Sequence, residues 1–408
     1  MKYGLIGEKL GHSFSKDIHN MLADYDYQLT EIAIEDFHAF MEAKDFNAIN
    51  VTIPYKQDVI PYLDSISDVA KSIGAVNVIV NKDGKLYGYN TDFAGMEALT
   101  KHMGLLLSGK KVLILGSGGT SKTAYALAKS LEARKILRLS RTAREDCITY
   151  EDAYRNHLDA EIIINTTPAG MFPKVDSCAI EIERFTKLEG AIDAVYNPLR
   201  TEFVQRAEKM GAKASGGLYM LVAQAVFAVE HFLDCKLDSS KLDEVFDKIL
   251  ESKENIVLTG MPSCGKTTIG KALASKLDWQ LIDTDAEIVK KAGKPITDIF
   301  AEEGEKAFRD LESQVISDVS MMQGVIISTG GGAILRDENI KALKKNGKVY
   351  FIDRKLEDLA ATKDRPLSSD IESLKKRYDE RYDIYCHTAD VRIINDKKIE
   401  DAINAILK

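Results

Sequence analysis

The sequence is poor in the features that mark secreted, membrane and nucleic-acid-binding proteins. Its 408 residues contain five cysteines without C-x-x-C spacing, so neither a disulfide framework nor a structural zinc site is expected. A net charge of -8 leaves no basic excess to meet nucleic-acid phosphates. No apolar run is long enough to cross a bilayer, and the first residues are typical of a strand rather than a signal peptide. These absences predict a cytoplasmic protein with no nucleic-acid or membrane partner.

The length and the order of apolar runs predict more than one domain of the α/β class. At roughly 150 residues per domain, the chain is expected to hold two or three domains. A hydrophobic content of 45% and a charged content of 29% are typical of globular protein. Short apolar strands alternate with helical stretches, which predicts parallel, doubly wound sheets. The polar stretch 237–254 is the expected linker region, itself partly helical.

A phosphate-binding loop lies in the second half of the chain, at residues 260–267. Its sequence, G-x-x-x-x-G-K-T, follows the apolar run 255–259 and precedes a helical stretch at 268–277, which is the strand–loop–helix context of such loops. Backbone N–H groups of the loop are expected to surround a β-phosphate, with Lys266 on the β- and γ-oxygens and Thr267 on Mg²⁺. The predicted ATP-binding residues are Gly260, Met261, Pro262, Ser263, Cys264, Gly265, Lys266, Thr267 and Thr268.

Two acidic residues follow the loop at the end of the apolar run 279–285. Asp283 and Asp285 are two positions apart, so on a strand they would share one face. One could hold Mg²⁺ and the other could accept a proton from an acceptor hydroxyl. Acids at strand ends also cap helices, and that alternative stays open.

In the first half, polar side chains recur where predicted strands end, which is where open α/β sheets bind ligands. These residues are Ser13, Ser15, Asn50, Thr52, Lys56, Asn77 and Asp92. An isolated Ser13 is also a good helix cap, and a lone lysine in a loop is commonly only solvated. The number of such positions favours a site for a small polar ligand. Gln224, in a long apolar helix, could be a core amide or a ligand contact.

A second nucleotide-binding pattern begins at residue 111. The strand 111–115, the glycine turn 116–119 and an alanine-rich helix follow the order of dinucleotide-binding folds. The next strand ends at residues 140–142, Ser-Arg-Thr, where NAD-preferring folds place an acid. This serine and arginine, together with Arg144, favour the 2′-phosphate of NADP, although a merely solvated arginine pair is the alternative.

From residue 1 to about 240, the chain resembles a shikimate dehydrogenase. The motifs that carry the resemblance are the Gly-His-Ser-Phe-Ser start, residues 50–56, 74–77 and 90–92, the glycine turn, Ser140-Arg141-Thr142 and Gln224. The resemblance implies that shikimate is bound by Ser13, Ser15, Asn50, Thr52, Lys56, Asn77, Asp92, Tyr196 and Gln224. It implies that NADP is bound by Gly116, Ser117, Gly118, Gly119, Thr120, Ser140, Arg141, Thr142, Arg144 and Gly217. Lys56 and Asp92 would be the catalytic pair, with the lysine protonating the developing alkoxide.

From about residue 254 to the end, the chain resembles a shikimate kinase. The matching motifs are the phosphate loop, residues 283–285, Gly304-Glu305 with Phe308-Arg309, the triple glycine 330–332, residues 365–367, and Arg381 with Tyr385. The resemblance implies that Asp285, Arg309, Gly331 and Arg381 bind shikimate, with Asp285, Lys266 and the lid residue Arg365 catalytic. Arg365 would also contact ATP, and Thr267 and Asp283 would hold Mg²⁺. The chain departs from the family at Ser263, where a glycine is usual, and in the lid, which lacks an arginine ahead of Arg365.

Together these patterns predict a bifunctional enzyme. The expected domains are 1–95 completed by 216–240 for shikimate, 96–215 as a Rossmann domain for NADP, a linker at 241–253, and a phosphate-loop kinase domain with a parallel sheet at 254–408. The enzyme would reduce 3-dehydroshikimate with NADPH and then phosphorylate shikimate with ATP and Mg²⁺, towards chorismate and the aromatic amino acids. Two alternatives stay open: a dehydrogenase for quinate, and a kinase half reduced to nucleotide binding. The sequence does not constrain the oligomeric state.

Overall fold

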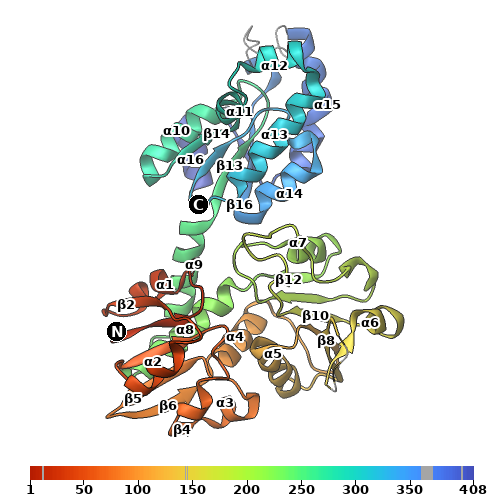
Figure 1. Cartoon of the computed structure of the whole chain (residues 1–408). Coiled ribbons are helices and arrows are strands. Elements are labelled where there is room, and N and C mark those ends of the chain that lie inside the picture. The colour runs from red at the N-terminus through yellow and green to blue at the C-terminus, as the bar shows by residue number, and fades with distance from the viewer. Residues whose placement is uncertain (12, 143, 145, 360–370, 397) are drawn as a thin grey trace. The chain divides into compact units, whose positions relative to one another are not determined.

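The computed structural model describes residues 1–11, 13–142, 144, 146–359, 371–396 and 398–408. The chain divides into two compact units, Met1–Leu250 and Glu251–Lys408 (Figure 1). Each unit is described by itself.

The first sheet of the first unit has the strand order β2-β1-β3-β5-β6-β4. Its strands are β1 (Tyr3–Gly7), β2 (Tyr27–Glu31), β3 (Ala48–Val51), β4 (Ser65–Ile66), β5 (Val78–Lys82) and β6 (Lys85–Tyr89). Strands β1, β2 and β3 are parallel, but β5 runs antiparallel to β3 and β6. The two-residue turn Asp83-Gly84, with φ of 53° and 81°, closes the β5–β6 hairpin. This sheet is therefore mixed, unlike the parallel sheets that strand–helix alternation predicts.

Helices pack on this sheet, and one of them, α8, comes from a segment that follows the second sheet in the sequence. The helices that belong with the first sheet are α1 (Ser15–Leu22), α2 (Phe37–Ala43), α3 (Asp68–Ile73), α4 (Asp92–His102) and α8 (Leu218–Leu233). Ala228 and Phe232 of α8 share a core cluster with residues of β1, β3 and β5. A Cβ at Gly95 would lie 2.7 Å from the carbonyl oxygen of Met220, so α4 and α8 can pack this closely only with glycine there.

The second sheet has the order β12-β11-β10-β7-β8-β9 and is parallel throughout. Its strands are β7 (Lys111–Leu115), β8 (Lys135–Ser140), β9 (Ile148–Thr149), β10 (Ile162–Asn165), β11 (Gly190–Asp193) and β12 (Lys213–Ser215). Val112 and Ile114 pack against α4 and α5 (Gly119–Ser130), whereas Leu113 and Leu115 face α6 (Tyr150–Asn156) and α7 (Glu202–Lys209). Because both faces are covered, β7 is a continuous apolar run, as predicted.

The order of the strands around β7 indicates at which edge of the sheet a ligand is expected to bind. The chain goes from β7 to β8 on one side and later to β10 on the other, so the carboxyl end of β7 is a topological switch point. The glycine turn follows β7 at this point. Helix α9 (Lys241–Lys253) follows, and one residue separates it from the first strand of the kinase-like sheet.

The second unit contains a five-stranded parallel sheet of order β14-β15-β13-β16-β17. Its strands are β13 (Asn255–Thr259), β14 (Leu281–Asp283), β15 (Ile326–Ser328), β16 (Gly347–Asp353) and β17 (Val391–Ile394). Its helices are α10 (Lys266–Leu277), α11 (Thr284–Ala292), α12 (Ile296–Glu302), α13 (Gly304–Ser320), α14 (Asp337–Asn346), α15 (Ile371–Thr388) and α16 (Ile399–Ile406). The predicted parallel sheet is confirmed. Within the described residues, no helix is long and apolar enough to span a membrane.

Candidate active sites

Lys56 and Asp92 form an ion pair between the end of β3 and the start of α4. The ammonium Nζ lies 2.5 Å from Asp92 Oδ2, and the two side chains are 15% and 8% exposed. Asn77 donates from Nδ2 to the other carboxylate oxygen, Oδ1, at 2.9 Å. Asp92 is therefore fixed from both sides, and it holds the lysine ammonium at one position.

Asn50 belongs to a buried network that sequence reasoning did not anticipate. The hydroxyl of Tyr27, a fully buried residue on β2, donates to Asn50 Oδ1 at 2.7 Å. Because this oxygen is occupied, the Asn50 amide nitrogen faces away from Tyr27 and approaches the Asn77 carbonyl at 3.4 Å. His19 stacks on the Tyr27 ring with centroids 3.8 Å apart, and burial lowers the pKa of His19 to about 3. A tyrosine in a strand looks like ordinary core in the sequence.

The two serines lie at the start of α1 and contact each other. Ser13 Oγ donates to Ser15 Oγ at 3.0 Å and accepts the backbone N–H of Ser15 at 3.2 Å. Ser13 thus accepts the first amide of the helix, but it is not the N-cap that the capping alternative predicted, because Phe14 occupies that position and no side chain caps the helix. The Ser13 hydroxyl also hydrogen-bonds with Tyr196. The Tyr196 ring packs on Phe14 with centroids 5.2 Å apart. A loop of the second sheet therefore reaches residues predicted to bind the substrate.

Gln224 and Thr52 complete the set predicted for shikimate. Gln224 is 8% exposed, donates to the Leu221 carbonyl at 2.9 Å and lies beside Gly95, one turn after Asp92 on α4. The core-amide interpretation and a ligand contact are both compatible with this position. Thr52 directly follows β3 and is half-buried.

The glycine turn after β7 adjoins the lysine of the ion pair. A Cβ at Gly119 would lie 3.9 Å from Lys56 Cδ, so the N-terminus of α5 and Lys56 are neighbours. Gly116 has φ of 115°, and a Cβ there would lie 2.8 Å from Thr166 Oγ1. The predicted turn residues Ser117, Gly118 and Thr120 are partly or fully exposed around it. Lys122, which sequence reasoning passed over, donates to Gln57 at 3.2 Å.

The residues predicted to select NADP lie at and beyond the carboxyl end of β8. Ser140 is buried, whereas Arg141, Thr142 and Arg144 are exposed and available to an anionic group. Gly217 occupies a different position, because a Cβ there would lie 2.4 Å from the Ala194 carbonyl oxygen. Glycine is needed at 217 for this close approach, whether or not it also contacts the cofactor.

The phosphate loop joins β13 to α10, as predicted. Lys266 Nζ donates to the carbonyl oxygens of Gly260 at 2.8 Å and Met261 at 3.0 Å, so the lysine folds over its own loop. Ser263 has φ of 63°, a left-handed conformation that glycine adopts more easily. The Asn395 side chain, after β17, donates to the Cys264 carbonyl at 2.8 Å.

Asp283 and Asp285 are arranged differently from the sequence prediction. Strand β14 ends at Asp283 and α11 begins at Thr284, so the two acids do not share a strand face. Asp283 Oδ1 caps α11 by accepting from the backbone N–H of Asp285 at 3.0 Å. Its Oδ2 accepts from Thr267 Oγ1 at 3.4 Å. The capping alternative is therefore correct, and it leaves a hydroxyl and a carboxylate oxygen together. This donor pair suits Mg²⁺, which takes few protein oxygens besides phosphate and water.

Asp285 and Arg309 meet at the triple glycine that follows β15. A Cβ at Gly330 would lie 2.6 Å from Asp285 Oδ1, and one at Gly332 would lie 2.3 Å from Arg309 Nη1. A side chain at either position would therefore force Asp285 or Arg309 to move. Arg381 Nη1 donates to the Gly331 carbonyl at 3.0 Å, so three segments far apart in the sequence converge here.

Glu312 is the residue of this centre that sequence reasoning missed. It lies on α13 and accepts from Arg309 Nη1 at 2.7 Å, with a side chain only 1% exposed. Burial raises its pKa, and the neighbouring Arg309 opposes that shift. The spacing of three residues on one helix face was the available signal. Arg365, the predicted lid arginine, lies outside the described residues.

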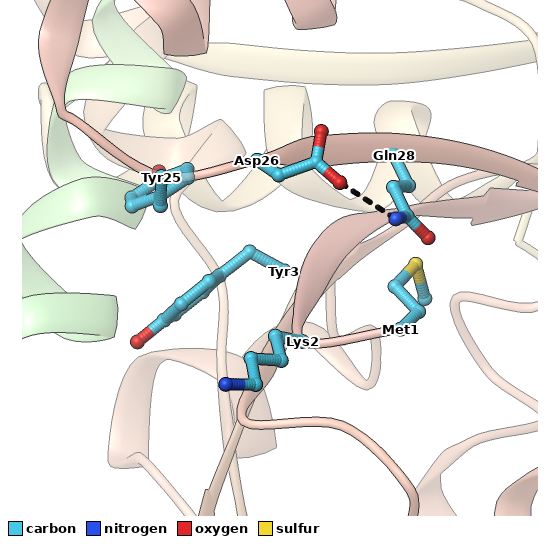
Figure 2. Close-up of a pocket in the computed structure, with 6 residues that line it drawn as sticks. All are labelled: Met1, Lys2, Tyr3, Tyr25, Asp26 and Gln28. Carbon is cyan, nitrogen blue, oxygen red and sulfur yellow. Dashed lines mark hydrogen bonds between the residues drawn. The ribbon is translucent and has the colours of Figure 1, made fainter.

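A hollow elsewhere on the first unit does not involve the predicted residues. Figure 2 shows it between β1 and the edge strand β2. The ring centroids of Tyr3 and Tyr25 are 4.5 Å apart, and Gln28 Nε2 donates to Asp26 Oδ2 at 2.7 Å. Its remaining lining residues are Met1 and Lys2.

Comparison with known proteins distinguishes the two halves. The family model for the shikimate dehydrogenase substrate binding domain matches residues 5–79, and the model for shikimate kinase matches residues 262–408. The NADP(+) shikimate dehydrogenase of Clostridium beijerinckii is 38% identical over 268 residues, which is 62% of this chain and 98% of that protein.

Solved structures agree with this assignment. Shikimate dehydrogenase 1 of Peptoclostridium difficile is 36% identical with a TM-score of 0.58, over 61% of this chain and 98% of that one. The enzyme of Thermus thermophilus, solved with NADP(H) and shikimate, is 25% identical with a TM-score of 0.55, over 61% and 99%. The chain therefore belongs to the shikimate dehydrogenase family through its first part and ends in a shikimate kinase domain, and it joins these two activities of the shikimate pathway in one polypeptide.

Proposed function

We propose that the first unit reduces 3-dehydroshikimate to shikimate with Lys56 as the general acid. When bound, NADPH supplies the hydride. The Lys56 ammonium then stabilises the alkoxide that develops on the substrate and donates a proton from Nζ to it. Asp92 keeps the ammonium in place, and its own position is fixed by Asn77. The observation that carries the proposal is this ion pair, 2.5 Å long and largely buried at a sheet edge next to the glycine turn.

The proposed substrate contacts surround that pair. Asn50 would donate its amide to a substrate oxygen, because its carbonyl oxygen already accepts from Tyr27. Ser13 and Ser15 would bind the substrate carboxylate, and Thr52, Asn77, Tyr196 and Gln224 would complete the set. Hydroxyl and amide donors in these places suit a ring that carries several hydroxyls and one carboxylate.

NADPH is the proposed nicotinamide cofactor, held by the glycine turn and the end of β8. The N-terminus of α5 would face the pyrophosphate, with the backbone of Gly116 to Thr120 around it. Exposed Arg141 and Arg144 would pair with the 2′-phosphate, alongside Ser140 and Thr142. Gly217 would let the backbone approach the nicotinamide side.

The second unit is proposed to transfer the γ-phosphate of ATP to shikimate. Asp285 would accept the proton of the attacking hydroxyl, and Arg309 and Arg381 would bind the substrate carboxylate beside Gly331. Lys266 and the backbone of the phosphate loop would neutralise the phosphates. Thr267 and Asp283 would hold Mg²⁺ through their adjacent oxygens. Arg365 keeps its sequence-based assignment as the lid arginine.

The proposed domain division follows the same logic. Residues 1–95 and 216–240 would bind shikimate, 96–215 would bind NADP, 241–253 would link the halves, and 254–408 would form the kinase. The return of α8 to the first sheet supports the split substrate domain.

One observation favours a second candidate function for the kinase half. The left-handed Ser263 replaces a usual glycine, and a residue held there costs about 1 kcal/mol or more. A loop strained in this way could hold a nucleotide without efficient transfer, which would make the unit a nucleotide-binding module. The presence of Asp285, Arg309 and Arg381 around the triple glycine argues against this, because a nucleotide-binding module needs no residues for an acceptor substrate.

The deciding experiment is ADP release by the purified full chain with Mg-ATP, with and without shikimate, and without nicotinamide. Shikimate-dependent ADP release that is absent from Asp285→Asn is expected. ATP binding by calorimetry without shikimate-dependent turnover would favour the nucleotide-binding module. In parallel, NADP⁺ reduction by shikimate is expected to exceed NAD⁺ reduction by quinate, and the reverse order would favour a quinate enzyme.

A further inference from the structure

Asp193 is a buried acid that the proposed mechanism does not use. It ends β11, its exposed fraction is 0%, and it accepts three hydrogen bonds. Oδ1 accepts from Asn165 Nδ2 at 2.9 Å and from the Val195 backbone N–H at 3.0 Å, and Oδ2 accepts from Thr201 Oγ1 at 2.6 Å. All three donors are uncharged. A buried carboxylate is costly without such donors, so this arrangement calls for a reason.

The direction of each bond is fixed by a further contact. Asn165 Oδ1 accepts from both the backbone N–H and the hydroxyl of Thr167, at 3.0 and 2.7 Å, so its amide nitrogen must face Asp193. Thr201 caps α7 by accepting from the Val204 N–H at 3.4 Å, which leaves its hydrogen for Asp193. The Val195 backbone N–H can only donate. Three donors therefore point at one carboxylate.

These hydrogen bonds hold both ends of the loop formed by residues 194–200. Val195 lies at its start, Thr201 follows its last residue, and Asn165 ties both to the neighbouring strand β10. The loop carries Tyr196, whose ring packs on Phe14 and whose hydroxyl bonds with Ser13. A shift of the loop would therefore move a residue proposed to bind the substrate.

The same loop also sets the position of Gly217. The Gly217 N–H donates to the Val195 carbonyl at 2.8 Å, and its Cα lies so close to Ala194 that a Cβ would approach the Ala194 oxygen to 2.4 Å. Gly217 is proposed to lie at the nicotinamide side. The buried carboxylate of Asp193 thus supports Tyr196 at the proposed substrate site and Gly217 at the proposed cofactor site.

We propose that Asp193 is a positioning residue of the dehydrogenase, which holds loop 194–200 so that Tyr196 and Gly217 stand at the substrate and the cofactor. The inference rests on the proposed dehydrogenase function. Asp193 acts through the loop and is itself covered by it.

The ionisation of Asp193 changes how the loop end is held. Burial raises its pKa to about 7, and the three neutral donors act against that shift. A proton on the carboxyl would go to Oδ2, because Oδ1 already faces two obligatory donors. The Thr201 hydroxyl would then have to accept instead of donate, which loosens the link at that end of the loop. The KM for shikimate should therefore change across neutral pH.

The test compares three variants of the full chain with the natural protein: Asp193→Asn, Asp193→Ala and, as matched control, Glu151→Gln, an exposed acid of the same half. The KM and kcat of the dehydrogenase are measured between pH 5.5 and 8.5. Kinase turnover on the same chain reports folding of the second unit, and circular dichroism with thermal unfolding reports the first.

Asparagine has the shape of aspartate and can satisfy all three neighbours, accepting at Oδ1 and donating to the Thr201 oxygen. Like the protonated carboxyl, this amide makes the Thr201 hydroxyl accept, so Asp193→Asn should show at every pH the KM for shikimate that the natural protein reaches at low pH, within about threefold of its neutral-pH value, and should lose the inflection near pH 7. Asp193→Ala leaves three donors without their acceptor and should raise that KM about tenfold or more, with a smaller change in kcat. Glu151→Gln should change neither.

If Asp193→Ala does not fold, Thr201→Val and Thr201→Ser replace it. The serine keeps the hydroxyl and should preserve KM, and the valine should raise it. An unchanged KM and pH profile in the alanine or valine variant would overturn the proposal, as would equal losses in KM, kcat and kinase turnover. A natural chain that does not oxidise shikimate would instead refute the proposed function, which separates the two failures.

Discussion

Replacement of Lys56 by methionine should separate catalysis from stability in the first unit. Methionine keeps the unbranched side chain as far as Cε but removes the ammonium, which is both the proton donor and the partner of Asp92 at 2.5 Å. Loss of a positioned general acid lowers kcat roughly 10²–10⁴-fold. The electrostatic stabilisation of the alkoxide is lost with it, so the upper end of that range is expected.

The stability effect follows from the burial of the pair. Removing one partner of a buried ion pair costs about 3–5 kcal/mol. In the variant, Asp92 still accepts from the Asn77 amide at 2.9 Å, and 8% of its side chain is exposed to solvent. We therefore expect the lower end of this range, about 3 kcal/mol of unfolding free energy. At about 2–4 °C per kcal/mol for a unit of this size, ~3 kcal/mol lowers its Tm by roughly 6–12 °C.

The double variant Lys56→Met/Asp92→Asn removes both charges, so it separates the effect on stability from the effect on catalysis. An asparagine can still accept from Asn77, so most of the lost Tm should return, whereas hydride transfer should not. Differential scanning calorimetry gives the Tm of the first unit, and NADP⁺ reduction by shikimate gives kcat. The matched control is Lys82→Met, which removes an exposed lysine paired with Asp234 at 3.3 Å and should change neither. A Lys56→Met chain that retains more than a tenth of its kcat would refute the role of the lysine, and loss of kinase turnover would refute independent sites.

Three further predictions concern other groups. Asp285→Asn should abolish shikimate-dependent ADP release and leave the dehydrogenase rate unchanged, as coupled assays on one preparation would show. Glu312→Gln weakens the charged bond to Arg309 and should raise the kinase KM for shikimate about tenfold, which is ~1.4 kcal/mol; Glu305→Gln, on the exposed partner of the same arginine, should change it less than threefold. His19 has its pKa lowered by burial from 6.5 to about 3, so the unfolded chain binds a proton below pH 6.5 that the folded one does not. The free energy of unfolding should fall as the pH drops from about 6.5 towards 3, and urea titrations should show a shallower fall for His19→Phe; equal slopes would contradict the buried neutral histidine.

Sequence patterns were reliable where the chemistry lies within one short segment. The phosphate loop and the glycine turn need neighbouring backbone N–H groups at a helix start, so their spacing appears directly in the sequence. The apolar runs could also be predicted to be strands, because parallel strands covered on both faces are apolar throughout. The mixed pairing of the first sheet was not predicted, since it depends on β5 pairing antiparallel with β3 as well as on the β5–β6 hairpin.

The acids after β14 show how a local pattern can mislead. The two-residue spacing of Asp283 and Asp285 suggested one strand face, but the helix begins between them because Asp283 caps it. Competition between strand alternation and helix capping is decided by where the sheet stops pairing, and β14 pairs with β15 only as far as Asp283.

By itself, the sequence determined the α/β class, the two nucleotide-binding turns and the likeness of each half to a known enzyme family, because these follow from contiguous residues and their order. Only the tertiary structure decided which distant residues hold the sites in shape. Tyr27 sets the amide of Asn50, Glu312 holds Arg309, and Asp193 closes the loop of Tyr196. Each of these supports is a buried polar group, and burial is what obliges such a group to find its partner across the fold.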